Sequence, residues 1–546
     1  MGGQAIYQRL TVRVHHTGMN LFFQRLGRIG SALALLGALA WPQGAPLAQQ
    51  SKSAPLQVLP DLGDGAQMSP AAERRLGDSI VRSLYRDPDY VDDPVVMDYL
   101  QSLWQPLLAA GRLRGDLTAQ LDETYAWELL LGRDRSVNAF ALPGGYFGVH
   151  LGLVAIVNTR DELASVLGHE LSHVTQRHIA RNMAQQSAQA PWVMGAMILG
   201  VLAASKGSDA QAGSALITGG QAAAIQSQLN YSRDMEREAD RVGFGVMTQA
   251  GFAPQGFVAM FEKLQQSNRL NDSGGFPYLR SHPLTTERIS DMQNRIGTWP
   301  AAAPDVSAPW EPLLIAARAR VLSNPGVDAL RLWAVDVQPS VLASKPAGQQ
   351  AAALYGAAFA ALKLRDYAQA QALCAQLEQQ VRGHAAEARL ARLLRAELVM
   401  AQGNAVDAMA ALQAPAWGAE RAPLGRAGLF LLVQAQTQSA QGPALDQASG
   451  TLRDWVAAHP RDSLAWRLLG ATLEAQGRDV AAVRAQAQAD LLRYDLSAAL
   501  ARLRAAQDLV RLGHWGRMGP DYLEAAIVDT RTREVTQLLR EQALQR

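Results

Sequence analysis

A shortage of cysteine, of charge and of long apolar runs sets the first limits on this 546-residue chain. Its one cysteine, Cys374, can form neither an intramolecular disulfide nor a cysteine-based zinc site, so a metal here would be held by histidines and carboxylates. Charged residues make up 18%, and 51 basic residues nearly balance 49 acidic ones, which argues against a nucleic-acid binder with a global basic field. Hydrophobic residues make up 48%, which excludes a mostly disordered chain.

Two apolar runs are present, and both are shorter than the about 20 residues that a transmembrane helix needs. The first, residues 29–41, follows a basic stretch without acidic residues and ends at Pro42, which is the layout of a secretory signal peptide. We therefore expect a cleaved export signal at residues 1–48 and a linker at 49–68; an uncleaved N-terminal anchor is the alternative. The second run, residues 192–204, is interpreted either as a buried or lid helix or as a segment that contacts a membrane.

The rest of the chain divides at residues 300–309, an Ala- and Pro-rich stretch that reads as an interdomain linker. Before it, residues 69–299 combine helical patterns with strand-like segments, among them a strand pair around the turn at Pro143. After it, residues 310–546 are rich in Ala, Leu and Gln and form helix-length segments separated by short breaks. The predicted fold class is α+β but mostly α, with a small β-sheet in the first domain and an all-α solenoid in the second.

The sequence His169-Glu170-Leu171-Ser172-His173 is an HExxH motif inside a helical pattern. On a helix the two histidines lie four residues apart on one face, where they can bind one Zn²⁺. Glu170 is then placed to act as a general base toward water. His178 lies five residues after His173, and we expect it to point away from the ligand face and to lie at the surface. A motif with three fixed positions also arises by chance, so the zinc interpretation needs the support of a further ligand.

A catalytic zinc site takes three protein ligands and leaves one position for water. A third histidine six residues after His173 is excluded, because Ile179 occupies that position. The other option is a carboxylate on a later helix, where Glu236 and Asp240 lie four residues apart and share a face. Glu236 can be the third ligand, and Asp240 can orient a ligand histidine. A solvated, salt-bridged helix has the same spacing, and the HExxH motif favours the zinc site over it.

At these residues the chain resembles the M48 family of zinc metallopeptidases, which pairs HExxH with a downstream ExxxD helix. The resemblance covers residues 65–295 and implies a gluzincin-type metallopeptidase domain that holds one Zn²⁺ per chain. The segment from Asn138 to Gly145 resembles the family's strand and turn along the cleft, where the backbone pairs with an extended substrate. This assigns Asn138, Gly144 and Gly145 to substrate binding; an ordinary β-turn is the alternative.

The segment Ser281-His282-Pro283, followed by Arg288, also matches a motif of the family. In relatives the histidine faces the metal and is assigned either to transition-state stabilisation or to blocking the zinc as a fourth ligand. The resemblance makes His282 a candidate for both roles and Arg288 a candidate to order the segment. Without the family, a lone His-Pro pair is typical of a helix N-terminus.

The start of the segment at Trp466 matches the W-x₂-L-G pattern of a tetratricopeptide repeat, and a similar unit surrounds Tyr355 and Tyr367. The second domain thus resembles a tetratricopeptide array. Such stacked hairpins leave a concave surface, which favours docking of a protein partner. A solenoid that only stabilises or covers the protease domain is the alternative.

An export signal, an M48-like domain and tetratricopeptide-like repeats occur together in periplasmic members of the family. The resemblance implies a periplasmic zinc endopeptidase that hydrolyses misfolded or stalled outer-membrane proteins and contacts the outer-membrane assembly machinery through its repeats, with chaperone activity as a further expectation. One alternative is a chaperone or adaptor whose proteolysis is normally autoinhibited by His282. The other is a general periplasmic housekeeping peptidase. No nucleic-acid partner is expected, and peripheral contact with a membrane is compatible with the sequence.

Overall fold

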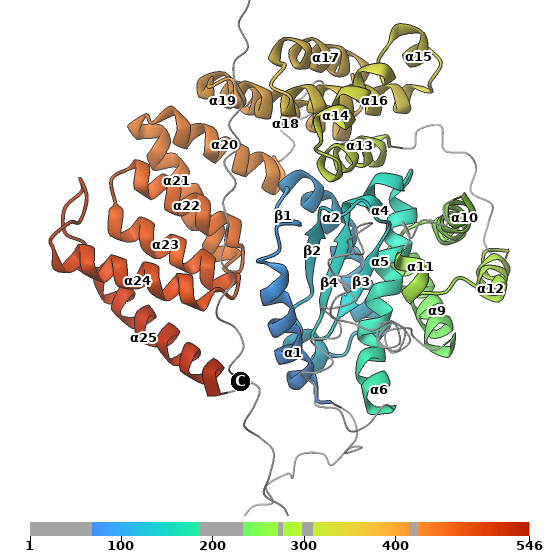
Figure 1. Cartoon of the computed structure of the whole chain (residues 1–546), viewed down its shortest axis with the longest axis horizontal. Helices are drawn as coiled ribbons and strands as arrows, with labels where there is room; N and C mark the ends of the chain where they lie inside the picture. The colour runs from blue at the N-terminus through green and yellow to red at the C-terminus, as the bar shows by residue number, and fades with distance from the viewer. Residues whose placement is uncertain (1–67, 186–232, 271–276, 298–308, 414–423, 545–546) are drawn as a thin grey trace, which may run out of the picture. The chain divides into compact units, whose positions relative to one another are not determined.

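The computed structural model describes residues 68–185, 233–270, 277–297, 309–413 and 424–544 (Figure 1). All of them belong to one compact unit that starts at Asp64. Several sequence-based expectations fall wholly or mostly outside the described residues: the export signal at 1–48, the linker at 49–68, the apolar run at 192–204 and the linker at 300–309. Of the helices that are described, none is both long and apolar enough to cross a membrane.

A small sheet forms the centre of the first part of the chain. Its strands are β1 (Tyr90–Val91), β2 (Glu128–Gly132), β3 (Ala139–Leu142) and β4 (Tyr146–His150). The spatial order is β1-β2-β4-β3, with β2 and β4 parallel and the other neighbours antiparallel. The expected turn joins β3 to β4, and it uses Gly144 and Gly145 at φ values of 76° and 80°, which favour glycine. β3 therefore forms one edge of the sheet.

Helices surround this sheet, and their starts follow local capping signals. Ser69 and Asp93 each precede a proline and accept a hydrogen bond from a backbone N–H of the first helical turn, as expected for an N-cap. The helices of this part are α1 (Pro70–Leu84), α2 (Pro94–Arg114), α3 (Ala119–Thr124), α4 (Leu151–Ile156), α5 (Arg160–Thr175), α6 (His178–Gln185), α9 (Arg233–Gln249), α10 (Gln255–Leu270), α11 (Pro277–Ser281) and α12 (Thr286–Ile296).

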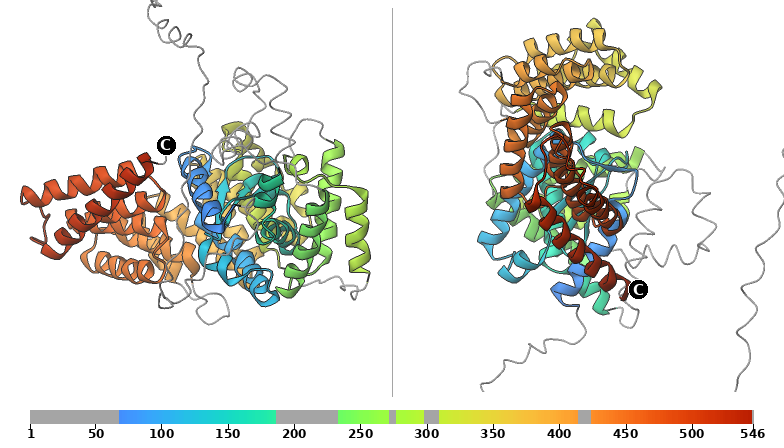
Figure 2. Two further views of the ribbon diagram at one scale, coloured as in Figure 1. Left: turned by 90° about the horizontal axis from the view of Figure 1, so that it is seen from below. Right: turned by 90° about the vertical axis from the view of Figure 1, so that its left-hand side faces the viewer.

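Helix α5 carries the HExxH motif and is buried from Glu162 to Thr175. It packs against α2, α9 and α10 and against β3, so neighbours cover it on several faces. The green helices α9, α10 and α12 gather on one side of the sheet in Figures 1 and 2. Burial on all sides removes bulk water from the polar groups of α5, which therefore need partners inside the protein.

Helices α5 and α9 are in close backbone contact where Gly168 and Gly243 face each other. A Cβ on Gly243 would lie 3.0 Å from the backbone of Gly168 and from the backbone nitrogen of His169. Because glycine has no side chain, two facing glycines let two helix backbones pack directly against each other. The contact brings the Glu236–Asp240 face of α9 beside His169.

The substitution Gly243→Ala is expected to destabilise the protein and to weaken the site that α9 helps to build. Overpacking against rigid backbone costs about 1–3 kcal/mol, more than the gain in helix propensity of up to about 1 kcal/mol. Gly245→Ala is the matched control on the same helix, because its Cβ would meet only the guanidinium end of Arg114, which can move. Denaturant unfolding of both variants measures the difference; equal free energies of unfolding would contradict the close-packing argument.

The second part of the chain is helical throughout its described residues. The helices are α13 (Glu311–Ser323), α14 (Val327–Asp336), α15 (Pro339–Ala343), α16 (Ala347–Lys363), α17 (Tyr367–Gln380), α18 (Ala385–Ala401), α19 (Ala405–Gln413), α20 (Gly425–Ser439), α21 (Gly442–Ala458), α22 (Ser463–Ala475), α23 (Asp479–Leu492), α24 (Leu496–Arg511) and α25 (Tyr522–Leu544). From α14 on, successive helices pack against one another along the chain, as expected for a repeat solenoid, whereas α13 packs against α16 and α18. The orange and red helices form a continuous stack in Figure 2. The predicted fold class is confirmed.

The two parts share one hydrophobic core, which runs from Val91 to Ala427. At their junction, Arg318 of α13 is fully buried and pairs with Asp93, the N-cap of α2, and with Glu397 of α18 at 2.8 and 2.7 Å. Burial alone would raise the pKa of Asp93, but the Arg318 guanidinium outweighs it and lowers that pKa. The domain boundary at 300–309 thus stays a prediction from composition, because the core continues across it.

Candidate metal centre

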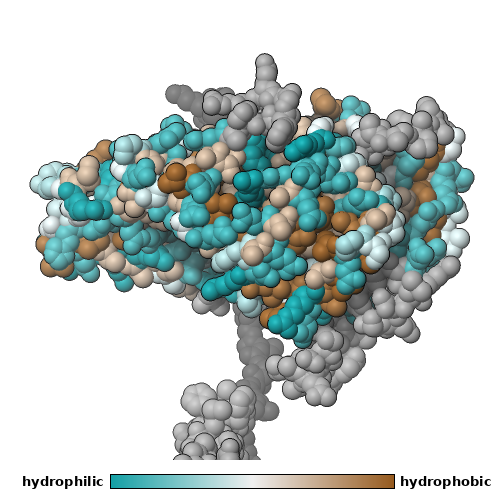
Figure 3. Space-filling model, turned by 90° about the horizontal axis from the view of Figure 1, so that it is seen from above, coloured by the Kyte–Doolittle hydropathy of each residue, from teal (hydrophilic) through white to brown (hydrophobic). Residues whose placement is uncertain are grey.

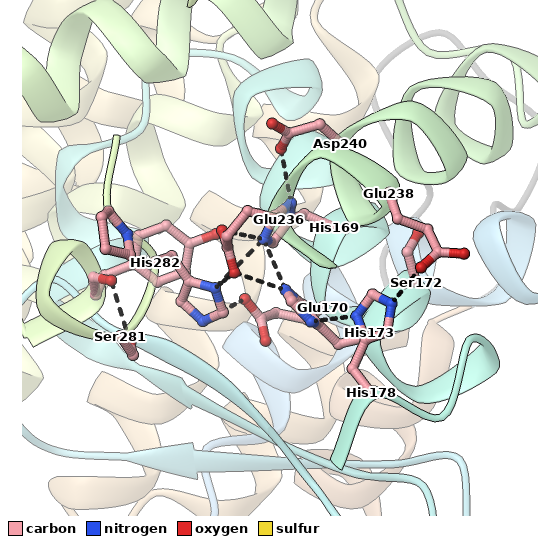
Figure 4. Close-up of polar contacts among 12 residues, drawn as sticks. His169, Glu170, Ser172, His173, His178, Glu236, Glu238, Asp240, Ser281 and His282 are labelled. Carbon is pink, nitrogen blue, oxygen red and sulfur yellow. Dashed lines mark hydrogen bonds and ion pairs between the residues drawn. The ribbon is translucent and has the colours of Figure 1, made fainter. Parts of the chain in front are cut away.

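Four buried side chains converge on one point from three elements of the fold (Figure 4). His169 and His173 lie on α5, Glu236 lies in the first turn of α9, and His282 directly follows the end of α11. One donor atom from each lies within 4.8 Å of all the others. The structure therefore brings together the three residues expected as metal ligands, with His282 as a fourth.

The separations between these atoms test whether the group fits a zinc ion. Two ligands at about 2.0–2.1 Å from one ion and at a tetrahedral angle lie about 3.3–3.4 Å apart. Here Nε2 of His169 lies 3.0 Å from Nε2 of His173 and 3.5 Å from a carboxylate oxygen of Glu236. Nδ1 of His282 lies 3.0 Å from Glu236 and 3.4 Å from Nε2 of His169. Nitrogen and oxygen donors at these separations fit Zn²⁺ well.

An ion-pair network holds the carboxylate side of this group. Asp240 lies one turn after Glu236 on α9, and its Oδ1 is 3.0 Å from Nδ1 of His169. Arg288 of α12 donates to both oxygens of Asp240 at 2.6 and 2.7 Å and lies 2.8 Å from Glu236. It also donates to the carbonyl oxygen of Pro283, which ties down the segment after His282. The position of Asp240 is the one expected for a carboxylate that orients a ligand histidine.

The network also sets the charge of its members. Burial alone would lower the pKa of His169, but the carboxylates of Asp240 and Glu236 outweigh burial and raise that pKa to about 9. Burial raises the pKa of Glu236, yet the nearby His282 and His169 outweigh it and hold that pKa well below its usual range. The carboxylate is thus kept ionised, as a metal ligand must be.

Glu170 lies beside the group, and its carboxylate has no hydrogen-bond partner among the described residues. The residue is 1% exposed, and within the described part of the chain neither carboxylate oxygen accepts a hydrogen bond. Nε2 of His282 is 3.5 Å from Oε1, which is too long for a good hydrogen bond. A buried carboxylate without a partner is costly unless a ligand or water completes it. The arrangement fits a base whose partner arrives with the substrate.

His178 was expected at the surface, and that expectation is wrong. The side chain is fully buried, and its Nδ1 lies 2.8 Å from Nδ1 of His173. The spacing argument failed because α5 ends at Thr175 and Arg177 takes a left-handed conformation with φ of 53°, so His178 does not continue the helix. Burial lowers the pKa of His178 to about 4.

Tyr278 is a second residue that sequence reasoning missed. Its buried ring lies 4.7 Å from the ring of His282, and its backbone N–H donates to the carbonyl oxygen of Val137. This bond links α11 to the residue before Asn138, at the start of β3. No pattern in the sequence marks a lone tyrosine for such a place.

The three residues predicted to bind substrate lie within the sheet region. Asn138 is buried, and its carbonyl oxygen accepts from the N–H of His150. The carbonyl oxygens of Gly144 and Gly145 accept from the backbone of residues 126 and 128. Their role in substrate binding therefore stays a prediction.

Comparison with known proteins identifies the family to which the chain belongs. Residues 116–296 match peptidase family M48. The chain is 33% identical to a putative beta-barrel assembly-enhancing protease of Vibrio cholerae over 58% of its own length and 63% of that protein's. It is 31% identical to the beta-barrel assembly-enhancing protease of Yersinia pestis over 84% of its own length and 88% of that protein's, and 29% identical to the Escherichia coli protein of that name over 92% and 96%. The resemblance drawn from the HExxH and ExxxD motifs is confirmed: the chain belongs to peptidase family M48 and is a metalloendopeptidase.

Proposed function

We propose that this chain is a periplasmic zinc endopeptidase that cleaves misfolded or stalled outer-membrane proteins. The observation that carries the peptidase activity is the buried group of His169, His173 and Glu236. Beside it lies the carboxylate of Glu170, which has no hydrogen-bond partner among the described residues. The cellular role is supported by the relatives that share most of the chain, which are named beta-barrel assembly-enhancing proteases.

In this proposal each side chain has one task. His169, His173 and Glu236 hold the zinc, and Asp240 orients His169 through its Nδ1. Bound zinc supplies Lewis acidity toward the scissile carbonyl and toward water. Glu170 takes the proton of the attacking water and passes it to the leaving amine.

His282 decides whether this site is open. A catalytic zinc site keeps one position free, whereas a fourth protein ligand closes it. Here Nδ1 of His282 completes the group of four, which supports an autoinhibited resting state. His282 lies in the chain between the short helix α11 and helix α12. A shift of this segment would move the His282 side chain away from the other three donors. Once displaced, the imidazole can still donate to the developing oxyanion.

The edge of the sheet offers a place for an extended substrate. β3 is the last strand in the order β1-β2-β4-β3, and within the described residues its outer edge pairs with no further strand. A peptide can add to such an edge through backbone hydrogen bonds, which read no sequence. Asn138 lies immediately before this strand, and Tyr278 connects that end to His282. This mode suits unfolded or stalled chains, whose backbone is free to pair.

The repeats provide surface for a partner of the assembly machinery. Between and at the ends of α24 and α25, four large apolar side chains are at least 64% exposed: Leu512, Met518, Tyr522 and Leu523. On the face in Figure 3, hydrophobic residues are interspersed with hydrophilic ones. Large exposed apolar patches are typical of docking sites, and these four side chains come from one stretch of the chain, residues 512–523. They support docking over a purely protective role for the solenoid.

Metal removal is the direct test of this function. The purified chain is expected to contain about one zinc and to cleave an unfolded outer-membrane β-barrel protein. A strong chelator should abolish cleavage and lower the melting temperature, because the metal binds only the folded state. Added zinc should restore both. Activity that survives complete metal removal would refute the proposal, and equal cleavage of casein and of the β-barrel protein would favour the housekeeping alternative.

A further inference from the structure

The turn after α5 returns a histidine to the metal group. Arg177 has a φ of 53°, a strained value for a residue other than glycine, and its guanidinium is held by Glu73 of α1 at 2.9 Å. The turn starts α6 at His178 and places its ring 4.9 Å from the ring of His173. Such strain persists only where surrounding contacts maintain it, and it is often found at functional sites.

His178 lies between His173 and Glu238 and contacts both (Figure 4). If His173 offers the lone pair of Nε2 to the metal, its Nδ1 carries the hydrogen and donates. Nδ1 of His178, at 2.8 Å, must then accept, which places the hydrogen of His178 on Nε2. That Nε2 lies 3.0 Å from a carboxylate oxygen of Glu238, which is the acceptor it requires. Arg181 donates to the same oxygen at 2.8 Å.

The other ligand histidine is supported in a matching way. Nδ1 of His169 lies 3.0 Å from Oδ1 of Asp240, and Asp240 is held by Arg288. Each ligand histidine on α5 is thus linked at Nδ1 to an arginine-bound carboxylate. Asp240 contacts His169 directly, whereas Glu238 contacts His178, which in turn contacts His173. The difference is that the acceptor for His173 is a neutral imidazole placed between the ligand and its carboxylate.

We propose that His178 is a positioning residue that, backed by Glu238 and Arg181, fixes the orientation and tautomer of His173 for zinc binding. This inference rests on the proposed function, because it assumes that His173 binds the metal through Nε2. Outer partners of ligand histidines typically contribute about 10- to 100-fold to metal affinity. His178 should therefore act on the metal and not only on packing.

The test is the zinc dissociation constant of the full chain, measured by competition with a chromophoric chelator. His178→Leu keeps the bulk but removes the acceptor, and it should weaken binding by about 10- to 100-fold. His178→Asn places an amide oxygen near the position of Nδ1 and should bind zinc close to the wild-type value. The visible spectrum of the Co²⁺-substituted protein should change in the Leu variant and not in the Asn variant. Equal dissociation constants for Leu and Asn would overturn the inference.

A double-mutant cycle with Glu238 keeps the inference testable if the Leu variant does not fold. Glu238 lies on the exposed side of the chain of bonds, so Glu238→Ala should fold and weaken zinc binding by up to about tenfold. Combined with His178→Asn, it should have a smaller effect than alone, because both residues act along one chain. Unchanged affinity in Glu238→Ala would count against positioning. A wild-type chain that binds no zinc would instead sink the proposed function itself.

Discussion

Glu170→Gln should reduce proteolysis by about 10²- to 10⁴-fold while the protein keeps its zinc. The amide has the size of the carboxylate but cannot accept the proton of the attacking water. The metal group does not include Glu170, so the ligands stay in place. The substitution also removes a buried charge that has no hydrogen-bond partner within the described residues, so the folded state should lose no stability. Turnover of an unfolded substrate and metal analysis of the same samples measure both effects.

The matched control is Glu162→Gln, a second buried glutamate on the same helix. Glu162 accepts from the backbone of Asn158 and pairs with Lys263 at 2.6 Å, away from the metal group. Its substitution should cost some stability and leave turnover per folded molecule near the wild-type value. Substantial activity in Glu170→Gln would show that another group is the base. Loss of zinc in that variant would mean that Glu170 supports the metal rather than the proton transfer.

His282→Ala should raise proteolysis by about tenfold to a thousandfold. In the structure His282 completes a group of four donors. Under the proposed autoinhibition, only molecules in which His282 has moved away admit substrate. A minor conformation is typically populated at about 0.1–10%, and the observed activity scales with that fraction. Removing the imidazole makes the open site the main state. The rate of cleavage at saturating substrate, compared at equal zinc content, is the measurement.

His150→Ala is the control for general loosening of the fold. His150 is also buried, but it pairs with the hydroxyl of Ser136 and is not a member of the metal group. It should lower stability without raising activity. A fall in activity in His282→Ala would indicate that stabilisation of the oxyanion outweighs the blocking role. An unchanged rate would argue against autoinhibition and against the chaperone alternative that depends on it.

The residue pairs on α5 and α9 could be predicted from the sequence because their spacing is local, whereas His282 was predicted only from the family resemblance. Four residues on a helix return to the same face, so His169 and His173 on α5, and Glu236 and Asp240 on α9, had to lie together wherever those helices formed. The capping signals at Ser69 and Asp93 and the glycine turn before β4 are local in the same sense. The composition of the repeats likewise determined an all-α second part.

Only the tertiary structure decided what lies between these local units. The closeness of α5 and α9 depends on two glycines far apart in the chain, and the junction of the two parts holds a buried ion pair between the distant residues Arg318 and Asp93. His178 shows the limit most clearly: its distance along the chain predicted a surface residue, yet the left-handed Arg177 turned it onto His173. Helical periodicity predicts which side chains share a face only for residues within the same helix. Where it ends, packing against distant residues such as Glu73 and Glu238 selects the backbone conformation, and no spacing in the sequence records that choice.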